Sequence, residues 1–144
     1  MKNNYVLFLF LGLFFSSCIR EYETITEFKI TNLTKNQIDI FVSNFETRYY
    51  NTLDTTFSIQ PESSIDFYYS NKGENAPFLH PFGIESDALI IFFNDTIGKL
   101  YAKGDGKNRN PLDIKNFINV QKDDEYYLFE YSITDEDLQE AIEN

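Results

Sequence analysis

Several residue types that catalytic or cross-linked proteins depend on are scarce in this chain of 144 residues, which has one Cys, one His and no Trp. A lone cysteine cannot form a disulfide within the chain, so the fold has to be held together by its core. A catalytic zinc site usually takes three protein ligands, commonly histidines, and His80 is alone. A Gly-x-Ser-x-Gly nucleophile elbow is also missing. We therefore expect no metal, no cofactor and no enzymatic activity.

Basic residues are few as well, with 12 Lys and Arg against 23 Asp and Glu and a formal charge of -11. A field of this sign repels phosphate backbones and anionic headgroups. The composition therefore excludes nucleic acid as an expected partner, together with electrostatic docking on a membrane.

The chain also lacks an apolar run long enough to cross a bilayer. The longest run, Tyr5 to Phe15, covers 11 residues, whereas a spanning helix needs about 20. Lys2 precedes this run and small serines follow it, which is the pattern of a secretory signal peptide. We expect a signal over residues 1–17, and a mature chain that begins at Cys18.

The residues Ser16-Ser17-Cys18 at the end of this run resemble the lipobox of bacterial lipoprotein precursors, in which Leu-(Ala/Ser)-(Gly/Ala)-Cys is cut before a cysteine that receives lipid. Phe15 stands where that family usually has Leu. The resemblance implies lipidation at Cys18 with two or three acyl chains, which would make membrane attachment stable. It also implies a place in the cell envelope, with the outer membrane expected and the side of that membrane left open.

After Cys18, the polar residues up to Thr26 are expected to form a short tether, and residues 27–144 a single domain. Alternating apolar residues and turn signals predict strands, with a strand or a helical turn followed by a strand over 112–120. The connections are too short for crossover helices, so we expect antiparallel pairing. The predicted strands cover 28–31, 38–42, 48–53 (or a bulged loop), 56–60, 64–70, 88–93, 97–103 and 125–133.

The strand at 88–93 is apolar on both faces, which predicts a central strand covered on both sides. Thr134, with Asp137 three residues later, predicts the start of a short C-terminal helix. The fold class expected is all-β, an antiparallel β-sandwich (immunoglobulin- or transthyretin-like) of about seven or eight strands. Segments 86–95 and 133–137 also resemble small envelope lipoproteins of Bacteroidota that have no assigned activity.

The loop from Ala76 to Phe82 is the best candidate for a binding site. It is stiffened by two prolines, and its apolar residues would form a presented tip. The alternative is that these rings plug one end of the sandwich or cover the second face of the 88–93 strand. The candidate residues are Phe78, Leu79, His80 and Phe82; exposed Tyr49, Tyr50 or Tyr68 would instead suit stacking on sugars.

Two further patterns involve polar side chains. Asp105, Asn108 and Asn110 offer oxygens for calcium, but basic residues are interleaved and the EF-hand spacing fails, so a hydrophilic turn is expected. Asp54-Thr55-Thr56 and Asp95-Thr96-Ile97 resemble the sites at which Bacteroidota O-glycosylate exported proteins. That resemblance makes Thr55 and Thr96 candidate modification sites.

The sequence therefore favours a lipid-anchored envelope protein that acts as a non-enzymatic binding or accessory module for a protein or a glycan. One alternative is a carboxylate-based glycan hydrolase, for which the many acidic residues supply candidates without discriminating among them. Another is an inhibitor or immunity-type lipoprotein. Two facing carboxylates in a pocket would favour the hydrolase, and a convex surface with an apolar patch would favour the binding module.

Overall fold

The computed structural model describes residues 23–46, 52–73, 76–84 and 86–143. The expected signal peptide, Cys18, Tyr49 and Tyr50 lie outside these residues. In chain order the elements are β1 (Glu23–Asn32), β2 (Ile38–Glu46), β3 (Thr52–Ile59), β4 (Ser64–Lys72), β5 (Ala88–Phe93), β6 (Ile97–Ala102), the 3-10 turn η1 (Ile114–Asn116), β7 (Ile118–Gln121), β8 (Tyr126–Ile133) and α2 (Asp135–Glu143).

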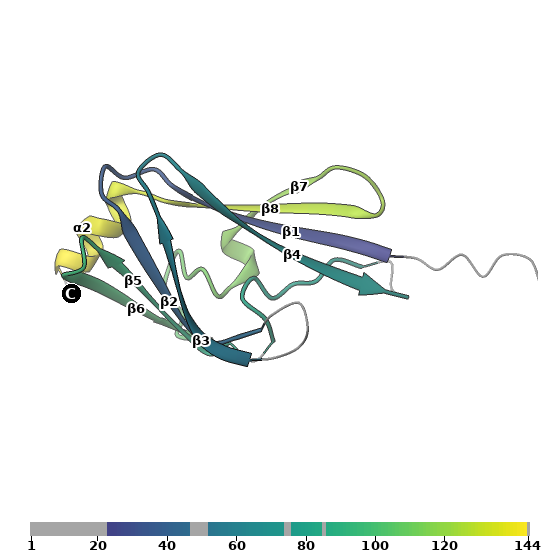
Figure 1. The fold of residues 1–144 in the computed structure, drawn as a ribbon, viewed down its shortest axis with the longest axis horizontal. Coiled ribbons are helices and arrows are strands. Elements are labelled where there is room, and N and C mark those ends of the chain that lie inside the picture. Colours follow the sequence, from purple (N-terminus) through teal and green to yellow (C-terminus); the bar gives the residue numbers. More distant parts are fainter. Residues whose placement is uncertain (1–22, 47–51, 74–75, 85, 144) are drawn as a thin grey trace, which may run out of the picture.

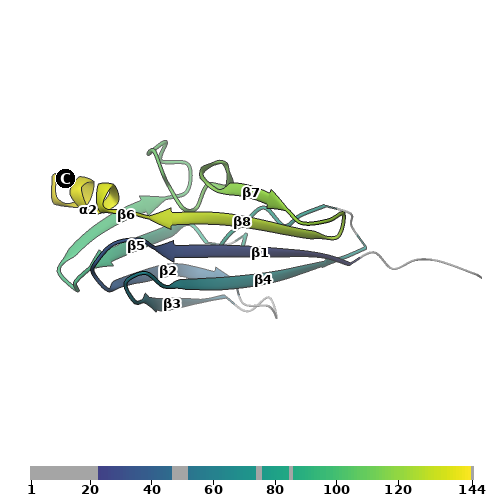
Figure 2. The same cartoon turned by 90° about the horizontal axis from the view of Figure 1, so that it is seen from above.

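The strands of the described residues form two sheets of four strands that face each other (Figure 1). The first sheet has the order β4-β1-β8-β7, and the second has the order β3-β2-β5-β6. Figure 2 shows the two layers from above, with α2 beyond the end at which β8 finishes. The structure is a β-sandwich with one short C-terminal helix, which confirms the predicted fold class.

One strand pair in the first sheet is parallel, which corrects the expectation of antiparallel pairing throughout. β1 pairs with β8 in parallel, with Phe28 opposite Phe129 and Ile30 opposite Tyr131. A parallel pair needs a long crossover connection, and here that connection contains the whole second sheet. The prediction considered only connections between successive strands, and so it missed a pairing between the first strand and the last.

The second sheet is built from antiparallel neighbours. β5 and β6, two strands predicted from the sequence, form a hairpin with Phe93 opposite Ile97. Asn94 and Asp95 make the turn with φ values of 50° and 58°. Positive φ at consecutive residues gives a turn whose twist matches that of the strands, and Asn and Asp accept this conformation more readily than most residues.

The core lies between the inner faces of the two sheets and is rich in aromatic rings. Phe28 is fully buried, and its ring centroid lies 5.8 Å from that of Tyr69, 5.7 Å from Phe117 and 5.4 Å from Phe129. Burying a side chain of this size contributes about 1.5–3 kcal/mol. The absence of a disulfide from the sequence is therefore matched by a dense aromatic core.

β1 begins earlier than the sequence pattern indicated, because residues 23–26 of the expected tether belong to the strand. In this segment Thr24 and Thr26 point inward and are buried, whereas Ile25 is 39% exposed on the outer face. The usual alternation of apolar inward and polar outward is inverted there. For this reason the period-two pattern became visible only from Phe28 onward.

Elsewhere the predicted elements are confirmed with small changes. A single strand, β3, covers the described part of the two strands expected at 48–53 and 56–60; residues 48–51 lie outside the described residues. The segment 112–120 is a 3-10 turn followed by a strand. Thr134 precedes α2 as predicted, and the backbone N–H of Thr134 donates to Asp137 Oδ2 at 2.9 Å.

Candidate functional site

The outer face of the second sheet is more apolar than an uncovered sheet face normally is. β5 was expected to be covered on both sides, but its burial alternates: Leu89, Ile91 and Phe93 are fully buried, while Ile90 and Phe92 are only half-buried. Figure 1 shows none of the described helices or strands over this outer face. The prediction of a doubly covered strand was therefore wrong for one of the two faces.

A continuous row of apolar side chains crosses this face. Phe41 of β2 pairs with Ile90 of β5, which pairs with Leu100 of β6. Leu100 is 53% exposed, and the other two are half-buried. We call these three residues with Phe92 the outer patch. Contiguous apolar patches, unlike single exposed apolar residues, mark interaction surfaces in soluble proteins.

Gly98 shapes one side of the outer patch. It lies opposite Phe92 in the β5–β6 register, and a Cβ at this position would be 3.0 Å from Phe92 Cε1. The ring of Phe92 therefore lies across the glycine, an arrangement that shields the backbone of a glycine in an edge strand. The missing side chain of Gly98 leaves room for the Phe92 ring to lie against β6.

Two carboxylates border the outer patch: Asp39 of β2, which lies opposite Phe92, and Asp95 of the β5–β6 turn. The hydroxyl of Ser58, opposite Asp39 in the β2–β3 pair, donates to Asp39 and holds the pKa of that carboxyl below its usual value. A hydrogen bond with Asp39 raises the pKa of Asp95. A like-charge pair at the rim disfavours acidic partners at this end of the patch.

The candidate binding loop at 76–82 is divided between the core and the surface. Phe82 is fully buried, and its ring centroid lies 5.6 Å from that of Phe67. The ring of Phe78 stacks on Tyr69 at 4.5 Å, and His80 makes an edge contact with Phe78 at 5.4 Å. These contacts close one end of the sandwich, as the alternative interpretation expected.

Two apolar side chains remain exposed on the same loop. Leu79 is 48% exposed and Ile84 is 49% exposed. The hydrogen bond from Gly83 N–H to the His80 carbonyl, at 3.1 Å, closes a tight turn between them. We call Leu79 and Ile84 the loop tip. Of the four residues proposed from the sequence, only Leu79 is free enough of the core to present an apolar surface.

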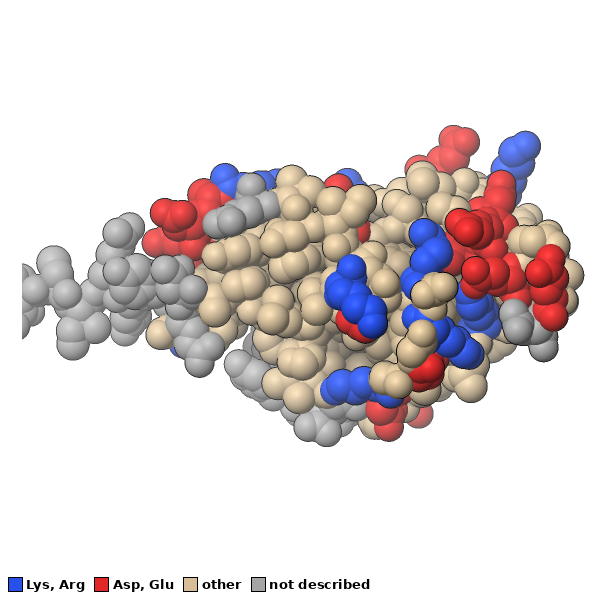
Figure 3. All heavy atoms as spheres, turned by 180° about the vertical axis from the view of Figure 1, so that it is seen from behind, with Lys and Arg blue, Asp and Glu red and all other residues tan. Residues whose placement is uncertain are grey.

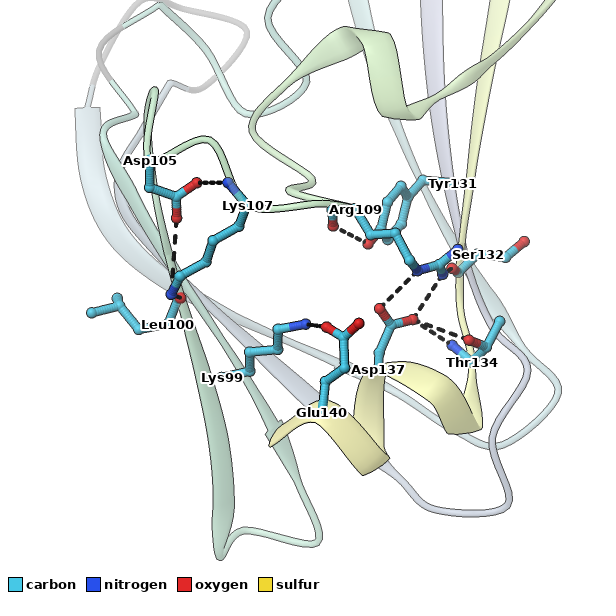
Figure 4. Close-up of polar contacts among 10 residues, drawn as sticks. All are labelled: Lys99, Leu100, Asp105, Lys107, Arg109, Tyr131, Ser132, Thr134, Asp137 and Glu140. Carbon is cyan, nitrogen blue, oxygen red and sulfur yellow. Dashed lines mark hydrogen bonds and ion pairs between the residues drawn. The ribbon is translucent and has the colours of Figure 1, made fainter. Parts of the chain in front are cut away.

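A cluster of charged and aromatic side chains joins α2 to the sandwich (Figure 4). Arg109 donates from Nε to Asp137 Oδ1 at 2.9 Å and from Nη2 to Asp137 Oδ2 at 2.8 Å. Lys99 on the inner side of β6 pairs with Glu140. Tyr131 donates to the Arg109 carbonyl at 2.6 Å. The cluster fixes α2 against β6 and the loop before η1.

Burial and neighbouring charges shift the pKa values of this cluster. Burial lowers the pKa of Lys99, but contacts with Glu140 and Tyr101 outweigh burial and raise it above the ordinary value. Burial is also the main reason why the pKa values of Tyr101 and Tyr131 are raised. A catalytic lysine or tyrosine acting as a base needs a lowered pKa. At neutral pH these groups keep their protons.

Basic side chains gather beside this cluster (Figure 3). Five of the 12 Lys and Arg residues fall between positions 99 and 115. They are already engaged: Lys103 donates to the Ile84 carbonyl at 2.9 Å, Lys107 donates to the Leu100 carbonyl at 2.7 Å, and Lys115 pairs with Asp113 at 2.6 Å. This group covers the edge of β6 and neighbouring turns.

The segment considered for calcium is a tightly bonded turn. Asp105 accepts hydrogen bonds from the backbone N–H groups of Ala102 at 3.0 Å and Lys107 at 2.9 Å. Asn110 donates to Asp105 Oδ1 at 2.9 Å and accepts from Leu112 N–H at 2.9 Å. These oxygens thus serve the turn. Among the described residues, no group of three or more His, Cys, Asp or Glu side chains is arranged to hold a metal ion.

The remaining candidates are spread over the surface. Thr96 is exposed in the β5–β6 turn, and Thr55 is half-buried in β3. Tyr68 is 52% exposed on the outer face of the first sheet. No described helix is long and apolar enough to cross a membrane. The structure does not bring these residues together with the loop tip or the outer patch into one site.

Comparison with protein-family models, curated proteins and solved structures finds no match for this chain.

Two features escaped sequence reasoning. The sequence does not reveal the outer patch, because the apolar run Ala88–Phe93 is compatible with a strand covered on one face and with a strand covered on both. The Arg109–Asp137 pair was missed because both residues had local explanations, Arg109 in a hydrophilic turn and Asp137 at a helix start. The one available signal was Asp137 itself, since a third acidic residue in the first turn exceeds what capping needs.

Proposed function

We propose that this chain is a lipid-anchored cell-envelope protein that acts as a non-enzymatic binding or accessory module. Acylated Cys18 attaches it to the membrane, expected to be the outer one, and the outer patch binds an envelope protein. The observation that carries the binding role is the apolar row Phe41, Ile90 and Leu100 across the second sheet. A glycan is the less favoured partner, because aliphatic side chains form half of the patch.

The anchor is tested by Cys18→Ser and cell fractionation. The wild-type protein is expected in the membrane pellet with an intact mass that includes acyl chains, and the variant in the soluble fraction. A variant that pellets as before would refute the anchor.

The docking surface is tested by capture from detergent-solubilised envelope with purified full-length protein as bait. Leu100→Glu places a charge on an exposed side chain of the outer patch, so binding of the partner should be lost while folding is retained. Ile118→Glu is the matched control, since Ile118 is 68% exposed on the outer face of the other sheet. If both variants capture the same proteins as the wild type, the outer patch is not the docking surface.

A further inference from the structure

We propose that the loop tip, Leu79 and Ile84, contacts the surface of the lipid bilayer in which the acyl anchor sits, and that it prefers electrically neutral headgroups. The inference rests on the proposed lipidation of Cys18. Both side chains are about half exposed, at 48% and 49%. The contact would fix how the domain stands on the membrane, and so which face of the sandwich a partner can reach.

The loop that carries the tip is held firmly against β1. The backbone N–H of Phe78 donates to Thr26 Oγ1 at 2.9 Å, and Thr26 is fully buried. The hydroxyl of Tyr69 donates to the Pro81 carbonyl at 3.3 Å. The tip is therefore presented by a loop whose neighbouring side chains are already ordered, so contact with lipid costs little additional conformational entropy.

The chain that leads to the anchor enters the sandwich next to this loop. β1 begins at Glu23, and five residue steps from Cys18 to Glu23 span at most about 18 Å. Thr26, which bonds to the loop, lies three residues further along β1, or about 10 Å. The tip is thus within reach of the membrane when the acyl chains are inserted.

The composition of the loop suits an uncharged interface. Residues 76–84 contain no Asp, Glu, Lys or Arg, in a chain that is 24% charged, and the Lys103 ammonium beside the tip is already bonded to the Ile84 carbonyl at 2.9 Å. Burying one Leu or Ile side chain contributes about 1.5–3 kcal/mol, and a tether raises the effective concentration of the tip at the bilayer. Together these effects favour shallow insertion of the two side chains.

Charge at the same end explains the preference for neutral lipid. The backbone N–H of Ile25 donates to the Glu125 carbonyl at 2.8 Å, which places the β7–β8 turn beside the start of β1. That turn, residues 122–125, contains Lys122 together with Asp123, Asp124 and Glu125, so its net charge is -2. Anionic headgroups would repel these carboxylates, so contact through the tip should weaken as anionic lipid increases.

Two other apolar side chains provide internal controls. Leu33 is 55% exposed and Ile142 is 56% exposed. Leu33 follows the last residue of β1, about 33 Å along the strand from its start, and α2, which contains Ile142, lies at that same end (Figure 1). These residues match the tip in exposure but not in distance from the anchor.

The test uses acylated full-length protein in phosphatidylcholine vesicles. Cys18 is the only cysteine, so once it is acylated the cysteine of Leu79→Cys, Ile84→Cys, Leu33→Cys or Ile142→Cys is the single free thiol for an environment-sensitive fluorophore. We expect nitroxide-labelled lipid to quench the probe at 79 and 84 at least twofold more than at 33 and 142. Replacing half of the lipid with phosphatidylglycerol should reduce that difference.

Equal quenching at the four positions in acylated protein would overturn the membrane contact but leave the anchor intact. Absence of acyl chains from the intact mass would instead refute the proposed function. A third outcome is that the thiol at position 79 is protected from labelling in native envelope, while the fluorophore at 79 is not quenched in pure lipid vesicles. This outcome would show that the tip docks on a protein and would also overturn the lipid contact.

Discussion

Arg109 and Asp137 form a two-pronged ion pair that joins the loop before η1 to the first turn of α2. Asp137 is fully buried, whereas the side chain of Arg109 is 35% exposed. The same carboxylate accepts a hydrogen bond from the backbone N–H of Thr134 at 2.9 Å. One aspartate therefore both begins the helix and holds it on the sandwich.

Replacing this aspartate should destabilise the protein strongly. Asp137→Ala removes both prongs and the cap, and we expect the free energy of unfolding to fall by about 2–4 kcal/mol. Glu136→Gln is the matched control on the same turn, because Glu136 is exposed, and it should change stability by less than about 0.5 kcal/mol. Urea denaturation of the two variants measures the difference. Similar midpoints would show that the ion pair does not hold α2.

The two buried tyrosines near this pair should respond differently to loss of the hydroxyl. Among the described residues, Tyr101 Oη is the one buried side-chain polar atom without a hydrogen bond, whereas Tyr131 Oη donates to the Arg109 carbonyl at 2.6 Å. Tyr131→Phe should cost about 1 kcal/mol, and Tyr101→Phe should cost less. Thermal denaturation at pH 7.5 compares them. A larger loss for Tyr101→Phe than for Tyr131→Phe would contradict this assignment.

The same tyrosines predict that stability falls at alkaline pH. Burial raises the pKa of Tyr131 and Tyr101 in the folded state, while an unfolded tyrosine has a pKa of about 10. Above that pH the unfolded chain loses protons that the folded protein keeps, so stability present at lower pH is lost as pH rises. Lys99, whose pKa is also raised, acts in the same direction.

Urea midpoints measured between pH 8 and pH 11 test this dependence. We expect the urea midpoint of the wild type to fall steadily above about pH 10. The midpoint of Tyr131→Phe should be lower at pH 8 and should fall by less. Lys99 and Tyr101 should leave part of the fall in that variant. A midpoint that is flat in the wild type over this range would contradict the burial of these phenols.

Most of the architecture follows from local sequence pattern. Alternation identified strands such as Ile38–Val42, and Thr134 with Asp137 identified the start of α2, because these signals depend on neighbours in sequence. The parallel pairing of β1 with β8 could not be predicted in this way, since it joins segments separated by a whole sheet. The start of β1 was hidden because Thr24 and Thr26 occupy inward positions where apolar residues are expected.

The candidate surfaces were only partly predictable for a related reason. Composition identified the loop at 76–82, but whether Phe78, Leu79 or Phe82 faces solvent depends on which ring fits beneath Tyr69 and Phe67. The apolar residues of β5 indicated burial, but the sequence does not say whether the cover comes from the chain itself or from a partner. The outer patch is where that distinction matters for function.

Gly98 allows the shape of the outer patch to be separated from its composition. In Gly98→Ala the new Cβ would meet Phe92 Cε1 at 3.0 Å and Ile90 Cγ2 at 3.5 Å, so the half-exposed Phe92 ring has to move aside. Alanine also restricts the unfolded chain more than glycine, a gain of about 0.5–1 kcal/mol that offsets the contact. We therefore expect nearly unchanged stability.

Binding should respond to that movement of the ring. Capture of the proposed envelope partner by Gly98→Ala should fall several-fold, because the Phe92 ring no longer lies flat across β6. The control is Ala102→Ser, at an exposed position beyond Leu100 on the same strand; it preserves the patch and should bind as the wild type does. Gly73→Ala would not serve as a control, since Gly73 has a φ of 84° that strains an alanine. Unchanged capture by Gly98→Ala, with Leu100→Glu still inactive, would place the contact on the β6 side of the patch and exclude the Phe92 ring from it.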